Sequence, residues 1–340
     1  MQRLVILAPN WLGDAVMALP AIADVRRALP AAHLTIAARG AVAPLFQLVP
    51  EVNETIVLGG GASLRRVATW GSLGAELSGC GFDAALLLPN SMHAALVASR
   101  AGIPERWGYG NGIRRRWLTR SVPRTPRGHQ TDYYRRLVAA LGFANGPREP
   151  RMTVPESARS AADRLLEDAG WQRSAPLVAL APGAAYGGAK RWPPDRFAEL
   201  AAVLAGDGLE AVLVGSAADA ETAADVRRAF ERRVGSVAAL HDLTGRTDLP
   251  ALAGALTHCR ALITNDSGAM HLAAAAGVPV TAVFGPTNED ATRPIGDAHH
   301  VVSHQVWCRP CMLRECPIDH RCMRGVAVPA VVDAARRTMR

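Results

Sequence analysis

Lysine is almost absent from the sequence: Lys190 is the single lysine among 38 basic residues, and all the others are arginine. A composition that favours arginine accounts for most of this imbalance. The one lysine that remains points to a position where a guanidinium does not replace a compact ammonium group, because the two cations differ in shape and hydration. Chance survival of one lysine is the alternative, and the glycine-rich surroundings of Lys190 argue against it.

Aromatic residues and long apolar runs are also scarce. Aromatics make up 5% of the chain, which disfavours a protein that binds single-stranded nucleic acid by base stacking, in spite of a formal net charge of +8. No apolar run reaches the length of a membrane-spanning helix. The N-terminal run is interrupted by Asn10, Gly13 and Asp14, so it resembles a first buried strand more than a signal peptide. We expect a cytoplasmic protein without a nucleic-acid partner.

Apolar strand-like runs alternate with amphipathic helical stretches in both halves of the chain, and this alternation predicts an α/β fold of doubly wound parallel sheets. The expected buried strands are residues 4–8, 34–37, 55–58, 84–88, 177–180, 211–214, 261–264 and 280–284. The expected helices are residues 15–29, 92–100, 156–169, 195–204, 217–232, 249–256, 268–276 and 329–339.

A chain of 340 residues suits two domains, each large enough to bury its own core. Residues 147–155 break the pattern with three prolines and a glycine just before them. We therefore expect one domain at residues 1–155, a second at 156–325 and a final helical segment at 326–340. Ligands of such sheets bind at the carboxyl ends of the strands, so the informative residues should directly follow strands in a cleft between two facing domains.

A turn with a carboxylate follows the first expected strand, in the order Asn10, Trp11, Leu12, Gly13, Asp14. Gly13 allows a tight turn or the close approach of a ligand. Asp14 lies near the start of the next helix, where aspartate is a common N-cap. The functional alternative is a general base, because a positioned carboxylate accepts the proton of an attacking hydroxyl.

A loop rich in glycine and alanine, residues 181–193, follows the expected strand 177–180 and contains Gly183, Lys190 and Arg191. Its backbone can approach a ligand closely, and the two cations add positive charge beside the loop amides. This combination suits a diphosphate, although the spacing is not that of a Walker A loop. A solvated surface loop with a Lys-Arg pair is the alternative.

Polar residues also follow the expected strand 261–264. Asp266 and Ser267 are natural N-caps for the next helix, so the first amides, the Ser267 hydroxyl and the helix dipole could hold a phosphate beside Gly268. His271 lies about one turn into this helix. A packed core histidine is the simpler interpretation of His271 alone, whereas its neighbours favour a polar role.

Gly285 and Thr287 follow the expected strand 280–284. The pair Gly285-Pro286 marks a sharp turn at the strand end. Thr287 can offer a hydroxyl to a ligand there, and an ordinary strand-to-loop turn is the alternative.

Four of the six cysteines lie in one short stretch, at positions 308, 311, 316 and 322, with His320 nearby. Cys308 and Cys311 have the spacing of half a zinc knuckle, whereas Cys316 and Cys322 are spaced less regularly. Disulfides are disfavoured in the cytoplasm, which leaves structural zinc and free reduced thiols as the two interpretations. Zinc closed by four ligands has no open position, so we expect no catalytic metal.

A cluster of arginines forms the densest positive charge in the chain: Arg114, Arg115, Arg116 and Arg120, with Arg124 and Arg127 close by. Arginine binds phosphate and carboxylate groups with two parallel hydrogen bonds, so the cluster could bind an anionic lipid head group. A solvated basic loop is the alternative.

Together these motifs resemble one known family. Residues 10–14, 182–193, 265–271 and 285–286 are similar to the ADP-heptose:lipopolysaccharide heptosyltransferases, glycosyltransferase family 9, and so are residues 50–54, 88–91 and 101–104. The resemblance covers nearly the whole chain in the same order. It is strongest to the branch that adds the second heptose of the lipopolysaccharide core.

The resemblance implies a glycosyltransferase-B fold, in which the N-terminal domain takes the acceptor and the C-terminal domain takes ADP-heptose. A final helix usually returns toward the first domain. The family transfers L-glycero-D-manno-heptose to the heptosyl-Kdo2 inner core of lipid A, with inversion at the anomeric carbon. An anionic acceptor of this kind implies peripheral contact with the cytoplasmic face of the membrane. The Asp-x-Asp metal motif of many other nucleotide-sugar transferases is absent from the chain, and we expect no cofactor for the chemistry.

The resemblance also implies residue roles. Asp14 corresponds to the general base and Lys190 to the residue that stabilises the leaving diphosphate. The ribose carboxylate falls near Asp219 or Glu221. The diphosphate cradle corresponds to Asp266, Ser267, Gly268 and His271. The family assigns no role to the cysteines.

Three other functions stay open on the sequence. One is transfer of the first or third heptose by the same fold. The second is a sugar-nucleotide epimerase or hydrolase. The third is a non-catalytic protein that binds nucleotide sugar or anionic lipid, which predicts ADP binding without turnover.

Overall fold

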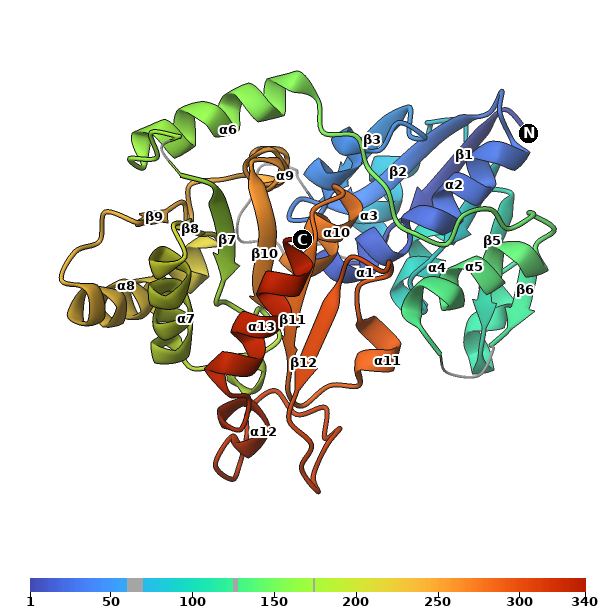
Figure 1. Ribbon diagram of the computed structural model, residues 1–340. Coiled ribbons are helices and arrows are strands. Elements are labelled where there is room, and N and C mark those ends of the chain that lie inside the picture. Colours follow the sequence, from blue (N-terminus) through green and yellow to red (C-terminus); the bar gives the residue numbers. More distant parts are fainter. Residues whose placement is uncertain (60–69, 125–127, 174) are drawn as a thin grey trace. The chain divides into compact units, whose positions relative to one another are not determined.

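The computed structural model describes residues 1–59, 70–124, 128–173 and 175–340 (Figure 1). The chain divides into two compact units, Met1–Met152 and Thr153–Arg340. The division lies inside the stretch 147–155, where prolines interrupt the helical and strand patterns. Within the described ranges, none of the helices is long and apolar enough to span a membrane.

The first unit is built on a sheet whose six described strands are all parallel, in the order β3-β2-β1-β4-β5-β6. The strand order reverses between β1 and β4, the kind of switch point where doubly wound sheets bind ligands. The strands are β1 (Arg3–Leu7), β2 (His33–Arg39), β3 (Glu54–Leu58), β4 (Ala84–Leu87), β5 (Glu105–Gly110) and β6 (Arg120–Pro123). The helices are α1 (Leu12–Met17), α2 (Leu19–Ala28), η1 (Ala43–Leu48), α3 (Trp70–Leu77), α4 (Met92–Arg100), η2 (Gly112–Trp117) and α5 (Gln130–Ala140).

The second unit repeats this topology, with six described parallel strands in the order β12-β11-β10-β7-β8-β9 and a switch point between β7 and β10. The strands are β7 (Leu177–Ala181), β8 (Glu210–Leu213), β9 (Leu240–Asp242), β10 (Cys259–Asn265), β11 (Val280–Phe284) and β12 (His300–Ser303). The helices are α6 (Glu156–Asp168), η3 (Gly188–Lys190), α7 (Pro194–Gly206), η4 (Ala217–Asp219), α8 (Ala220–Val234), α9 (Leu249–Thr257), α10 (Gly268–Ala275), α11 (Glu289–Thr292), α12 (Arg321–Arg324) and α13 (Val328–Thr338).

The central strands of the second unit are apolar because helices cover both of their faces. Every residue of β7 and β11 is buried. Helices α9 and α10 pack against β10, while α13 packs against α7, β11 and β12 (Figure 1). These layers fix the strand ends rigidly, and the polar loops that follow β7, β10 and β11 start from that rigid edge.

The final helix belongs to the second unit. Val328, Val331, Val332 and Ala335 of α13 are buried in the core of that unit, and the Thr338 hydroxyl hydrogen bonds to the Thr281 hydroxyl of β11 at 2.8 Å. The expectation that residues 326–340 form a separate segment is therefore corrected. The apolar face of α13 packs into the core of the second unit.

The doubly wound α/β fold class is confirmed, and all eight predicted strands are present. The prediction that all eight are buried is wrong for β3, an edge strand without a buried residue. The strands without a prediction are β5, β6, β9 and β12, and three of them lie at sheet edges. The prediction of one continuous helix over 15–29 is wrong. The helix breaks at Ala18, because Pro20 in the first turn of α2 has no N–H to continue the hydrogen-bond ladder.

Candidate active site

Asn265 holds both ends of the Gly-rich loop, defined here as residues 182–192. Its side chain is fully buried at the end of β10. The Nδ2 atom donates to the Pro182 carbonyl at 2.7 Å, and Oδ1 accepts from the Trp192 backbone N–H at 3.0 Å. These two hydrogen bonds therefore hold both ends of the loop beside the switch point between β7 and β10. Asn265 carries no predicted role, although an amide at the end of a buried strand is a signal that marks it.

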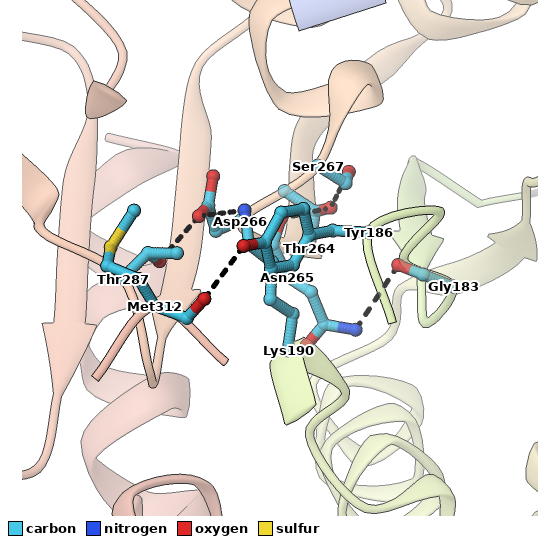
Figure 2. A network of polar contacts seen from close by, with 9 residues as sticks. All are labelled: Gly183, Tyr186, Lys190, Thr264, Asn265, Asp266, Ser267, Thr287 and Met312. Carbon is cyan, nitrogen blue, oxygen red and sulfur yellow. Dashed lines mark hydrogen bonds and ion pairs between the residues drawn. The ribbon is translucent and has the colours of Figure 1, made fainter. Parts of the chain in front are cut away.

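Three predicted site residues meet at one carboxylate oxygen. Oδ2 of Asp266 accepts hydrogen bonds from Lys190 Nζ at 2.6 Å and from Thr287 Oγ1 at 2.6 Å (Figure 2). The Lys190 and Asp266 side chains are only 13% and 6% exposed. Lys190 Nζ also lies 4.8 Å from the ring centroid of Tyr186. The interpretation of Lys190 as a solvated surface lysine is wrong, since its ammonium is held between a buried carboxylate and an aromatic face.

Ser267 occupies the N-cap position of α10, but its side chain makes no cap bond. Its hydroxyl pairs instead with the Thr264 hydroxyl at 3.1 Å (Figure 2). The first turn of α10, which begins at Gly268, therefore depends on another partner for its amides. His271 lies in the same helix and is buried. Asp266 precedes the cap and does not serve as one.

Asp219 lies against the start of the Gly-rich loop. A Cβ atom at Gly183 would overlap the Asp219 carboxylate, which explains the glycine. Asp219 Oδ2 accepts from the Ser216 N–H at 3.0 Å and from the Ser216 hydroxyl at 2.7 Å, and Arg191 Nη2 lies 3.9 Å from Oδ1. Asp219 therefore stabilises the turn before α8, whereas Glu221 is exposed.

The other two glycines of the loop make room for Arg314 and Glu315. A Cβ atom at Gly187 would overlap the Arg314 carbonyl, and one at Gly188 would crowd the Glu315 side chain. The Gly188 N–H donates to Glu315 Oε1 at 2.9 Å, and the Ala189 N–H donates to the Arg314 carbonyl at 2.9 Å. The expectation that the loop amides face a ligand is thus wrong for these two amides, because the chain itself uses them.

Asp14 lies in the first turn of α1 and is partly exposed. The N-cap of this helix is Trp11, so the interpretation of Asp14 as an N-cap is wrong. Burial raises the pKa of the Tyr134 phenol, and the charge of Asp14 raises it further, which places the carboxylate near that ring. Asn10 is exposed in the same turn, and Gly13 is partly buried.

Arg114 has a structural position that the predicted arginine cluster does not suggest. The side chain is buried, and its guanidinium donates to the carbonyls of Pro89, Ser91 and Tyr109, at 2.9 Å and 3.1 Å for the first two. Burial lowers the pKa of this guanidinium. The prediction that Arg114 binds an acceptor is wrong, because its donors join the segment that follows β4 to the Tyr109 carbonyl in β5.

The other described arginines of the cluster are all exposed and differ in their contacts. Arg120 donates to the Leu141 carbonyl at 2.9 Å and lies over the Trp107 ring, so it also supports the fold. Arg115 and Arg116 on η2 are exposed. Arg127 lies outside the described residues. Acceptor binding stays a prediction for Arg115, Arg116 and Arg120.

The four clustered cysteines line one pocket together with His320, Pro286 and Ala189. All six cysteines are free thiols. No group of three or more His, Cys, Asp or Glu side chains in the described part of the chain is arranged to hold a metal ion as it stands. Gly285 lies close against Met323, since a Cβ atom at this glycine would overlap the Met323 sulfur.

Known proteins share this fold and these motifs. A family model described as "Glycosyltransferase family 9 (heptosyltransferase)" matches residues 70–321. The chain is 30% identical over 310 residues to lipopolysaccharide heptosyltransferase 2 of Salmonella typhimurium, with 88% of each chain covered. It is 25% identical over 344 residues to lipopolysaccharide heptosyltransferase 1 of Pseudomonas aeruginosa, covering 93% of this chain and 87% of that one. The solved structure of E. coli ADP-heptose lps heptosyltransferase II matches with a TM-score of 0.83 at 29% identity, covering 100% of this chain and 98% of that one.

Proposed function

The chain belongs to glycosyltransferase family 9, the heptosyltransferases, and from this membership we propose that it transfers L-glycero-D-manno-heptose from ADP-heptose to the heptosyl-Kdo2 inner core of lipopolysaccharide. The higher identity to a relative named heptosyltransferase 2 than to one named heptosyltransferase 1 supports addition of the second heptose. The observation that carries the proposal is the buried Lys190–Asp266 pair at the carboxyl ends of the strands, beside the switch point where such sheets bind ligands.

Lys190 is the residue we propose to stabilise ADP as it leaves. An ammonium has three N–H donors, and Asp266 accepts one of them, so further donors can reach the oxygens of a diphosphate. The contacts with Asp266 and Tyr186 fix the ammonium before the donor arrives, which avoids the cost of ordering it during the reaction. The first turn of α10, with Ser267 and Gly268, supplies the second positive element for the diphosphate.

Asp14 is the residue we propose as the general base. Inversion in a single displacement requires a base that takes the acceptor proton on one face of the sugar while the leaving group departs from the other. The transition state develops positive charge on the sugar ring and negative charge on the diphosphate. Asp14 belongs to the first unit and Lys190 to the second, which suits an acceptor and a donor held by separate units. We propose that the exposed Arg115 and Arg116 bind acceptor phosphates.

The proposed chemistry uses protein groups and no metal. If the cysteine cluster holds zinc, the zinc is structural, since four thiolate ligands leave no open position for a substrate. We place the enzyme in the cytoplasm, in peripheral contact with the membrane face that presents its lipid acceptor.

The test is product analysis by mass spectrometry with a series of defined acceptors. The protein is incubated with ADP-heptose and either Kdo2-lipid A, its heptosylated form or a form with two heptoses. We expect one heptose to be added to the heptosylated acceptor alone. Addition to one of the other two acceptors assigns the first or third heptose instead. A donor consumed equally without acceptor would indicate a hydrolase or epimerase, and ADP binding without turnover would indicate a binding protein.

A further inference from the structure

The segment 304–320, here called the cysteine loop, is held by something other than a hydrophobic core. It connects β12 to α12 without regular secondary structure, and none of its residues is buried. Its large apolar side chains are exposed, led by Trp307 at 77% and Met312 at 52%. A segment that buries so little must offset the loss of backbone entropy in another way. Small protein segments of this kind are usually held by disulfides or by a metal ion.

The cysteine loop and the adjoining helix α12 gather metal-ligating side chains around one pocket. Cys308, Cys311, Cys316 and Cys322 all line it, whereas the other two cysteines of the chain lie elsewhere. His320 lines the same pocket, and its Nε2 atom is buried without a hydrogen-bond partner. Buried nitrogens are rarely left unpaired, so this orphaned atom is a second and independent sign that the pocket receives a polar or charged partner.

We propose that Cys308, Cys311, Cys316 and Cys322 bind one thiophilic metal ion, Zn²⁺, and that this ion fixes the part of the loop that supports Lys190. Four thiolates satisfy tetrahedral zinc, with Zn–S distances of about 2.3 Å. No three donors among the described residues are yet arranged to hold an ion, so the thiols turn inward on binding. Cys308, Cys311 and Cys316 lie in irregular chain and none of them is buried, so they can make this change, whereas Cys322 is held in α12. His320 then lies beside bound thiolates, which accept its N–H.

The position of the ligands links this site to the Gly-rich loop. Residues 312–315 lie between Cys311 and Cys316, and they carry the contacts to that loop. The Tyr186 hydroxyl donates to the Met312 carbonyl at 2.8 Å (Figure 2), and residues 314 and 315 accept the Ala189 and Gly188 amides. The Met312 N–H donates to the Pro286 carbonyl at 2.9 Å, beside Thr287. An ion that fixes both ends of this segment therefore fixes the wall behind Tyr186 and Lys190.

The metal itself is tested without reference to activity. The full chain is purified without a metal-affinity tag, and its zinc content is measured by mass spectrometry, with Cys311→Ser and Cys316→Ser as variants. Cys80→Ser in the first unit is the matched control. We expect about one zinc per chain in the wild type and in Cys80→Ser, and little in the other two. Absence of metal from the wild type, with the four thiols reacting freely or joined as disulfides, overturns the site.

The link to Lys190 is tested by hydrogen exchange and by a double-mutant cycle. Removal of zinc from the wild type with a chelator should speed exchange at the Gly188 and Ala189 amides and leave the first unit unchanged. The cycle rests on the proposed function: Cys311→Ser should lower turnover in the wild type but add little to Lys190→Ala. Unchanged exchange at the Gly188 and Ala189 amides would overturn the link to Lys190. The same holds if the two substitutions lower turnover independently, so that their effects multiply fully in the double variant. Neither result would contradict the metal site itself. Exchange and metal content stay informative even if the chain transfers no heptose.

Discussion

Lys190 and Asp266 come from loops 76 residues apart in sequence, and their side chains meet at 2.6 Å in a largely buried pair. The same Asp266 oxygen accepts the hydroxyl of Thr287, and the ring of Tyr186 lies beside the ammonium. The only lysine of an arginine-rich chain is thus held in a place that suits a compact cation. This arrangement positions an ammonium for the proposed stabilisation of ADP.

Two replacements of Lys190 should show how much of its effect on catalysis comes from its positive charge and how much from the compact shape of its ammonium group. Lys190→Ala should lower kcat by about 10²-fold or more, as for loss of one preorganised electrostatic donor, and Lys190→Arg should restore only part of it. The larger planar guanidinium cannot keep both the Asp266 contact and the position of Nζ. Steady-state kinetics with ADP-heptose measure kcat for both Lys190 variants. Arg246→Ala is the control for loss of one exposed positive charge. Full activity in Lys190→Arg contradicts the argument.

Replacement of Asp266 should cost stability as well as activity. Asp266→Asn leaves a largely buried ammonium without its anion, and breaking such a pair costs roughly 3 kcal/mol. Thr287→Val removes one hydrogen bond to the same carboxylate and should cost less, roughly 2 kcal/mol. Urea unfolding measures the free energy of unfolding of both variants. A smaller loss in Asp266→Asn than in Thr287→Val would show that the ion pair contributes little to stability.

Arg114 and its two exposed neighbours should behave differently. Arg114→Ala leaves three backbone carbonyls without their buried donor and should lower the free energy of unfolding by about 3 kcal/mol or more. Arg115→Ala and Arg116→Ala should leave stability nearly unchanged and raise KM for the lipopolysaccharide acceptor. Thermal melting and acceptor kinetics are measured on all three. If Arg114→Ala has normal stability and a raised KM for the acceptor, Arg114 binds the acceptor and its structural role is contradicted.

Acid should weaken a contact that links α5 to the end of the first unit. Arg148 donates to both carboxylate oxygens of Asp132, at 2.8 and 2.7 Å, and this hydrogen bonding lowers the pKa of Asp132. A carboxyl whose pKa is lower in the folded state stabilises the fold above its unfolded pKa, and this contribution is lost as the pH falls through the folded pKa. The wild type should therefore exceed Asp132→Asn in stability at pH 7, and the difference should shrink below about pH 4. A difference constant from pH 7 to pH 2 contradicts this, with Asp333→Asn as control.

The sequence predicts the buried parts of the fold well. Strands β7 and β11 are continuous apolar runs because both faces are covered, and such runs are visible without a structure. The edge strands β6, β9 and β12 are short and mixed in polarity, so their pairing depends on neighbours that a local pattern does not reveal. The break at Ala18 follows from Pro20 and was visible in the sequence.

The site is predictable to the level of loops, and the structure adds the reasons for individual residues. The motifs around Lys190, Asp266 and Thr287 follow three different strands, and parallel strands bring their carboxyl ends to one edge. The sequence does not reveal that Gly187 makes room for the Arg314 backbone, because that contact joins distant segments. In the sequence, a buried arginine cannot be told from an exposed one. Only the three carbonyl partners of Arg114 in the structure distinguish it from its exposed neighbours.

The central claim is that the chain couples departure of ADP from ADP-heptose to attack by an acceptor hydroxyl, with Asp14 as the base. The most direct measurement is the initial rate of ADP release with and without heptosyl-Kdo2-lipid A, in the wild type and in Asp14→Asn. We predict release that depends on the acceptor, lowered by about 10²-fold or more in Asp14→Asn, with donor binding nearly intact. Release that ignores the acceptor contradicts the transferase, and a normal rate in Asp14→Asn contradicts the base.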